Sequence, residues 1–201
     1  MTTFKITDEL IEKIHKLIEE KQKKELTTLL NDLHYADIAE IIHELDTEEG
    51  VYIIRLIDAE KTSDVLTELD DDYRENILKN LSAKEIADEI IELDTDDAVD
   101  IISELPEDRK TEVISHITDV EHAKDIVELL RYGEDTAGGL MAKELVKVNE
   151  NWNVLKCVKE MREQAAHVTR VHSIYVVDDN DVLKGRLSLK DLLTTSTRSE
   201  V

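Results

Sequence analysis

The residues with the clearest chemical potential form an acidic run in the middle of the chain. Between Asp88 and Asp108 the sequence has ten carboxylates and no lysine or arginine. Three of these residues, Glu92, Asp96 and Asp100, are spaced by four, and like charges at this spacing on a helix repel each other. A hard divalent cation would offset the repulsion, because Mg²⁺ prefers oxygen ligands and needs only one or two carboxylates per site. The run therefore indicates either Mg²⁺ sites or a solvated acidic helix face.

Other residue types with catalytic or metal-binding potential are not grouped in the sequence. The seven histidines have no HExxH pattern and no partner at the spacing of zinc ligands. The sequence contains no GxSxG elbow, no P-loop and no GxGxxG fingerprint. Its one cysteine, Cys157, falls on the apolar face of a predicted helix, where a thiol is usually inert. These observations predict a protein without catalytic activity of its own.

Composition and charge limit the class of protein and its partners. The 201 residues have a formal net charge of -23 and are 41% hydrophobic, which is enough for one or two compact cores. The negative charge argues against nucleic acid and anionic lipid surfaces as partners, since both are polyanions, and favours cations or basic proteins. With one cysteine, no secretory signal and no run of about 18 apolar residues, we expect a soluble chain in a reducing, cytoplasmic setting.

The negative charge is confined to one part of the chain. Residues 25–131 include 9 basic and 32 acidic residues, whereas the segments before and after them are almost neutral. An asymmetry of this size separates regions with different roles. We therefore place a domain boundary near Arg131 and Tyr132, with predicted domains at residues 1–131 and 132–201.

A twelve-residue repeat explains the acidic part of the chain. Apolar residues recur at this spacing at nine consecutive positions: Leu33, Leu45, Ile57, Leu69, Leu81, Leu93, Leu105, Ile117 and Leu129. At six of these positions the next residue can cap a helix: Asp46, Asp58, Asp70, Ser82, Asp94 and Thr118. The similarity is closest at a spacing of 24, which indicates one helix pair per repeat. Because helices of two to three turns are not stable alone, they must stack around a shared apolar seam as a superhelix.

The hydrophobic period changes on both sides of the repeat. An amphipathic pattern from Ile6 to Ile18 predicts an N-terminal capping helix. In the C-terminal segment, residues 145–152 indicate a strand, residues 154–165 a helix, and residues 173–188 two strands joined by a turn before a final helix. The predicted fold class is mainly α, with a superhelix of short helices in 24-residue pairs followed by a small β-α-β-β-α unit.

One decapeptide gives the sequence a family resemblance. YGEDTAGGLM, at residues 132–141, is similar to the junction signature of the MgtE family of magnesium transporters, where a helical N domain meets the first CBS motif. Acidic short-helix repeats precede it here, and the segment after it ends in a CBS-like pattern, Gly185-x-x-Ser188-x-x-Asp191. The resemblance covers nearly the whole chain and implies that the β-α-β-β-α unit is a partial CBS unit.

The resemblance implies a regulatory role. In the MgtE family the N domain and a CBS pair lie on the cytoplasmic side of a membrane channel and act as a Mg²⁺ sensor, in which bound ions hold the domains together and the pore shut. The implied partners are Mg²⁺, a second CBS motif and a membrane domain, in a full-length homodimer. This chain stops after one CBS motif, so we expect a soluble cytosolic fragment whose apolar CBS face lacks its twin.

The matching motifs also transfer the family's site residues to this sequence. The acidic pair on an N-domain helix corresponds to Asp96 and Asp100, and an earlier acidic position corresponds to Asp64, so the resemblance implies that these residues bind Mg²⁺. One alternative is a CBS module that senses ATP or another adenosine nucleotide, in which Ser188 and Asp191 would contact the phosphate and the ribose. Another alternative is a structural helical scaffold for a basic partner.

Overall fold

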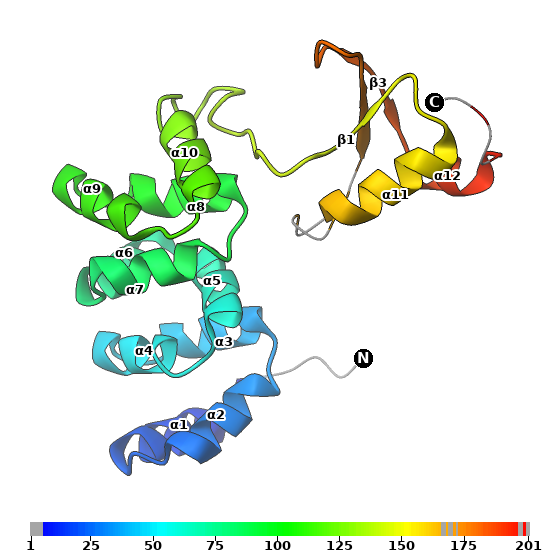
Figure 1. Cartoon of the computed structure of the whole chain (residues 1–201). Coiled ribbons are helices and arrows are strands. Elements are labelled where there is room, and N and C mark those ends of the chain that lie inside the picture. The colour runs from blue at the N-terminus through cyan, green and yellow to red at the C-terminus, as the bar shows by residue number, and fades with distance from the viewer. Residues whose placement is uncertain (1–5, 166–167, 169–170, 172, 197–198, 200–201) are drawn as a thin grey trace. The chain divides into compact units, whose positions relative to one another are not determined.

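The structure is a computed structural model that describes residues 6–165, 168, 171, 173–196 and 199. The chain divides into two compact units (Figure 1). The first unit consists of Met1–Leu93 and Asp97–Gly139, and the second of Asp94–Asp96 and Leu140–Val201. The structure thus divides the chain between Gly139 and Leu140, and the boundary near Arg131 stays a prediction.

The elements described from Asp8 to Leu129 are all α-helices of 8 to 12 residues. They are α1 (Asp8–Glu19), α2 (Lys23–Asn31), α3 (Tyr35–His43), α4 (Thr47–Ile54), α5 (Ala59–Glu68), α6 (Asp71–Asn80), α7 (Ala83–Ile90), α8 (Thr95–Ser103), α9 (Glu107–His116) and α10 (Val120–Leu129). Figure 1 shows them stacked in chain order, from α1 and α2 at one end to α9 and α10 at the other. The predicted stack of short helices is confirmed.

Capping residues set the starts of several helices. Asp46, Asp58 and Ser82 are the N-caps of α4, α5 and α7, and each accepts a hydrogen bond from a backbone N–H of the first turn. The prediction for Thr118 was wrong, because the N-cap of α10 is Asp119. The Asp119 carboxylate accepts from two backbone N–H groups at once, and the helix therefore begins one residue later than expected.

The twelve-residue register forms the core of the helical unit. Eight of the nine periodic residues are buried, and the first of them, Leu33, is half-buried. Helices one repeat apart pack on each other: α3 on α5, α5 on α7, α7 on α9, and α4 on α6. This packing explains the closer similarity at 24 residues, because each helix contacts its counterpart in the next repeat.

Basic side chains in the helical unit bind carbonyl groups at helix ends. Lys61 donates to three carbonyls that follow or end α2, Arg55 donates to the carbonyl of Asn80, and Arg109 donates to the carbonyl of Leu81. Arg74 donates to the carbonyls of Leu66 and Leu69 and to the Glu104 carboxylate. We call the four side chains of this kind the basic clamps: Arg55, Lys61, Arg74 and Arg109. The clamps satisfy carbonyls that a helix end leaves without an intrahelical partner.

The second unit is a small sheet packed with two helices. Its strands are β1 (Val146–Asn149), β2 (Ile174–Val177) and β3 (Leu183–Leu187), in the order β1-β2-β3, with β1 parallel and β3 antiparallel to β2. The helices are α11 (Val154–Gln164) and α12 (Leu189–Thr194), so the predicted β-α-β-β-α order is confirmed. The buried core consists of Val146, Val148, Val154, Cys157, Ile174, Val176 and Leu192.

An aspartate organises the turn between β2 and β3. Asp178 accepts hydrogen bonds from the backbone N–H groups of Asn180 and Val182, and its carboxylate pairs with Lys184 at 2.8 Å. The Lys184 ammonium, together with the two backbone donors, lowers the pKa of Asp178 to about 2. The predicted turn between these two strands is therefore held by one ionised side chain.

The helices in the described part of the chain are short and amphipathic. None of them combines the length and the hydropathy that a membrane span requires.

Candidate functional site

Two carboxylates of α8, those of Asp97 and Asp100, line a hollow in the helical unit. The hollow has a volume of about 740 Å³ and is lined by His43, Thr67, Leu69, Asp70, Asp71, Asp72, Tyr73, Arg74, Asp97, Asp100 and Ile101. Five of these residues are aspartates, and they come from the start of α6 and the first two turns of α8. An open hollow with this charge attracts cations.

The sequence places aspartates here for reasons of helix chemistry. Asp70 precedes α6, and Asp71 and Asp72 lie in its first turn, where the positive end of the helix dipole favours carboxylates. Asp97 lies in the first turn of α8, and Asp100 follows it by about one turn, so both side chains lie on neighbouring positions of one exposed face.

The two basic groups of the hollow are already engaged within the helical unit. Arg74 donates to both oxygens of Glu104, at 3.0 and 3.1 Å from Nε, and to Asp71 at 2.8 Å. The hydrogen bond to Glu104 is the main cause that raises the pKa of Arg74. His43 accepts a hydrogen bond from the backbone N–H of Asp70 and stacks edge-on against Tyr73. Arg74 thus neutralises one lining aspartate, and the hollow remains acidic because five aspartates line it against two basic groups.

The three residues predicted to bind Mg²⁺ lie in different surroundings. Asp100 is exposed and lines the hollow, whereas the half-buried Asp96 and the exposed Asp64 of α5 are not among the lining residues. In the part of the chain that the structure describes, no group of three or more histidine, cysteine or carboxylate residues has an arrangement suited to one metal ion. The assignment of Asp96, Asp100 and Asp64 to Mg²⁺ thus stays a prediction.

Sequence reasoning missed most of the aspartates around the hollow. Asp97 belongs to the acidic run but does not share the four-residue spacing that drew attention to Asp96 and Asp100. The triplet Asp70–Asp72 is visible in the sequence as three consecutive aspartates. Of these three residues only Asp70 is identified from the sequence, as a possible helix cap, and the packing that brings the triplet beside α8 has no local signature.

The two residues of the nucleotide alternative lie at the start of α12. The Ser188 hydroxyl donates to the Asp191 carboxylate at 2.6 Å and accepts from the Asp191 backbone N–H at 3.1 Å. Both residues are exposed. Their spacing of three is therefore explained by helix capping, and a role in nucleotide binding stays a prediction.

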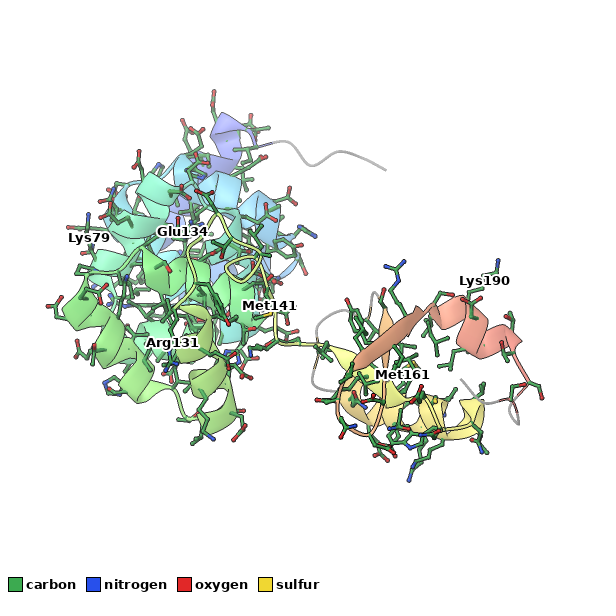
Figure 2. All side chains as sticks on the ribbon, turned by 90° about the horizontal axis from the view of Figure 1, so that it is seen from above. Lys79, Arg131, Glu134, Met141, Met161 and Lys190 are labelled. Carbon is green, nitrogen blue, oxygen red and sulfur yellow. The ribbon has the colours of Figure 1, made fainter. Side chains whose placement is uncertain are left out.

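The segment between the last helix of the first unit and Gly139 is a tightly bonded loop, in which Figure 2 labels Glu134. Thr136 donates to the Gly133 carbonyl from its backbone N–H at 3.0 Å and from its hydroxyl at 2.7 Å, and its hydroxyl accepts from the Gly139 N–H at 3.1 Å. A Cβ atom at Gly139 would overlap the Gly133 carbonyl, and one at Gly138 would overlap the ring of Tyr132. The glycine pair is therefore required by close packing.

Replacing Gly139 with alanine is expected to destabilise this loop by about 1 to 3 kcal/mol, because the new methyl group meets backbone atoms that cannot rotate away. Hydrogen exchange of the Gly139 amide would report the loss of its bond to Thr136. Gly133→Ala is the matched control, since a Cβ atom there meets only the Thr136 methyl at an ordinary 3.6 Å. Equal exchange rates in the two variants would contradict the steric argument.

The fold and the junction together define a class of protein: an acidic short-helix unit joined by a glycine-containing loop to a CBS-type unit. Family models match these same parts of the chain. The model of the MgtE intracellular N domain matches residues 33–135, and the CBS domain model matches residues 137–197. The chain belongs to the MgtE family.

Individual relatives agree with this assignment. The chain is 32% identical to the magnesium transporter MgtE of Thermus thermophilus over 96% of this chain and 44% of that protein. It is 37% identical to the magnesium transporter MgtE of Enterococcus faecalis over 36% of this chain and 16% of that protein. The chain spans less than half the length of the curated relatives that it matches.

Two solved structures share the fold. One is a crystal structure of the cytosolic domain of the Mg²⁺ channel MgtE in complex with ATP, with a TM-score of 0.86 and 28% identity over 94% of this chain and 77% of that chain. The other is a crystal structure of the soluble part of a magnesium transporter, with a TM-score of 0.79 and 25% identity over 96% of this chain and 76% of that chain. Both similarities extend over nearly the whole of this chain.

Proposed function

We propose that this chain is part of the cytosolic Mg²⁺-sensing region of a magnesium transporter or channel, in which Mg²⁺ bound by acidic residues favours the closed state. The observation that carries the proposal is the set of five aspartates around one hollow, within the segment of residues 25–131 that has 32 acidic and only 9 basic residues. Relatives over nearly the whole chain are named magnesium transporters, which supports Mg²⁺ as the ion.

The physical basis is electrostatic repulsion between carboxylates. Aspartates that lie close together repel each other, and a cation bound between them reduces this repulsion. A Mg²⁺ ion that binds the closed arrangement better than the open one stabilises it by RT ln(1 + [L]/Kd), about 2.7 kcal/mol at a hundredfold excess over Kd. Asp97 and Asp100 are positioned to contribute on the helical side, and Asp96 and Asp64 are the further candidates from the family resemblance.

The proposed partners follow from the second unit. Its exposed apolar residues include Leu183, Leu189 and Leu193, with exposed fractions of 62%, 44% and 70%. Side chains of this kind at the surface indicate an uncovered contact face. We assign this face to a second CBS motif in a full-length, homodimeric protein whose membrane domain has this region on its cytoplasmic side.

The proposal predicts a Mg²⁺-specific rise in melting temperature. Wild type and the double variant Asp96→Ala/Asp100→Ala would be melted in millimolar MgCl₂ and in NaCl of matched ionic strength. We expect a larger rise in MgCl₂ for wild type, reduced in the variant, because screening alone depends only on ionic strength. Asp108→Ala/Glu112→Ala is the control, since it removes two exposed carboxylates at the same spacing from α9. If all three proteins gain equally from both salts, these aspartates are only a solvated face.

A second candidate function is adenosine-nucleotide sensing by the CBS unit. The support for it is the similar solved structure, which is described as a complex with ATP. Calorimetry with ATP on wild type and on Ser188→Ala/Asp191→Asn distinguishes the two candidates. Binding of neither Mg²⁺ nor ATP would favour the structural scaffold for a basic partner.

A further inference from the structure

The seam between α5 and α7 contains a buried carboxylate oxygen without a partner. Glu89 lies in the last turn of α7, and its Oε2 atom is buried and accepts no hydrogen bond from the residues that the structure describes. The backbone carbonyl of Glu89 accepts a hydrogen bond at 2.6 Å from the hydroxyl of Ser63, a buried residue of α5. Glu89 is therefore located where the two helices pack.

The four charged groups that act most strongly on Glu89 are all acidic. Asp88, Glu92 and Glu85 lie on α7 or just after it, and Asp58 is the N-cap of α5. Burial, followed by these four charges, raises the pKa of Glu89 to about 7. An ionised Glu89 would thus add a negative charge to a site that already repels one.

The lysines and arginines of α5, α7 and α9, and Arg55 at the end of α4, have other partners. Arg55 pairs with Glu85, which lies one turn from Glu89. Together with Ser82, Arg55 lowers the pKa of Glu85 to about 2. The other basic groups bind carbonyls or exposed carboxylates: Lys61 with Leu30, Asn31 and Leu33, Lys84 with Asp88, Arg109 with Leu81, and Lys110 with Glu107. Protonation removes the charge of the Glu89 carboxyl, so that its Oε2 atom can stay buried without an ion partner.

We propose that Glu89 makes the α5–α7 seam a proton-sensitive joint, which is closed when this carboxyl is protonated and loosens when it ionises. A protonated carboxyl needs no counterion beside its buried Oε2 atom, whereas an ionised one adds its charge to those of four neighbouring carboxylates. This device is separate from the proposed Mg²⁺ sensing at the hollow, because it concerns α5 and α7 and not the aspartates of α6 and α8.

The sign of the pH effect follows from the raised pKa. A group whose pKa is higher in the folded state stabilises that state below its unfolded pKa, near 4.5, and the gain is lost as the pH rises through about 7. Glu89→Gln has a similar shape and no charge, so its stability lacks this dependence. Relative to this variant, the unfolding equilibrium constant of wild type should increase by about ten- to one-hundredfold from pH 5 to pH 8, since solvent reduces the full effect.

Urea unfolding of the 201-residue chain across this pH range tests the proposal, with Glu12→Gln as the control that removes an exposed charge from α1. We expect Glu89→Gln alone to flatten the pH dependence, and hydrogen exchange in α5 and α7 of wild type to accelerate above neutral pH. A carbon-13 NMR titration of the Glu89 carboxyl in wild type gives an answer even if the variant does not fold. A midpoint near 7 supports the joint. A midpoint near 4.5, or equal pH profiles for both variants, overturns it.

Discussion

Replacing Arg74 with alanine is expected to lower the free energy of unfolding by about 3 to 5 kcal/mol. The Arg74 side chain is 10% exposed and binds the carbonyls of Leu66 and Leu69 as well as the carboxylates of Asp71 and Glu104. The substitution leaves two buried carbonyls without a donor and the Glu104 carboxylate, which is 22% exposed, without its cation. Urea unfolding followed by circular dichroism measures the loss.

Lys79→Ala is the matched control for Arg74. Lys79 lies on the same helix, is 57% exposed and pairs with Glu75, one turn away, at 2.9 Å. Figure 2 shows it at the edge of the helical unit. Its removal should cost less than about 0.5 kcal/mol. Arg74→Lys should fall between the two, because an ammonium cannot reach all four acceptors as a guanidinium does. A cost below about 1 kcal/mol for Arg74→Ala would show that the clamp is not a structural requirement.

The second large effect is expected at the twelve-residue register. Leu93→Ala should cost about 2 to 5 kcal/mol, because Leu93 is buried between repeats and its truncation leaves a cavity as well as losing apolar burial. Val120→Ala is a suitable comparison, since Val120 is 64% exposed and its truncation should change stability by less than about 0.5 kcal/mol. Similar costs for the two substitutions would argue against the register as the source of the core.

The fold was predictable because its repeat is local. Apolar positions every twelve residues and a cap after most of them specify short helices, and neither signal depends on distant contacts. Thr118 shows the limit of this reasoning, because Thr118 and Asp119 can both cap a helix and the sequence does not rank them by geometry. The structure resolves the choice through the two N–H groups that Asp119 reaches.

The candidate site was predictable only in part. The acidic run predicted that α8 would present carboxylates, and Asp100 does line the hollow. The aspartates opposite come from the start of α6, about one repeat earlier in the chain. Which helix faces which across a superhelix depends on the rotation between repeats, and this rotation is not encoded in the hydrophobic period. Asp64 illustrates the same point, because it is exposed on α5 but does not line the hollow.

The basic clamps have a mechanical consequence. Arg55, Lys61 and Arg109 each bind a carbonyl 25 to 31 residues away in the chain, which is about one repeat. The angle between packed helices is therefore set by contacts between adjacent repeats. The curvature of the helical unit is the sum of these small rotations from one repeat to the next. A rotation of a few degrees between two packed helices, such as α5 and α7, displaces every helix farther along the stack. Helices α9 and α10 would then move relative to α1 and α2 by much more than any side chain at that joint.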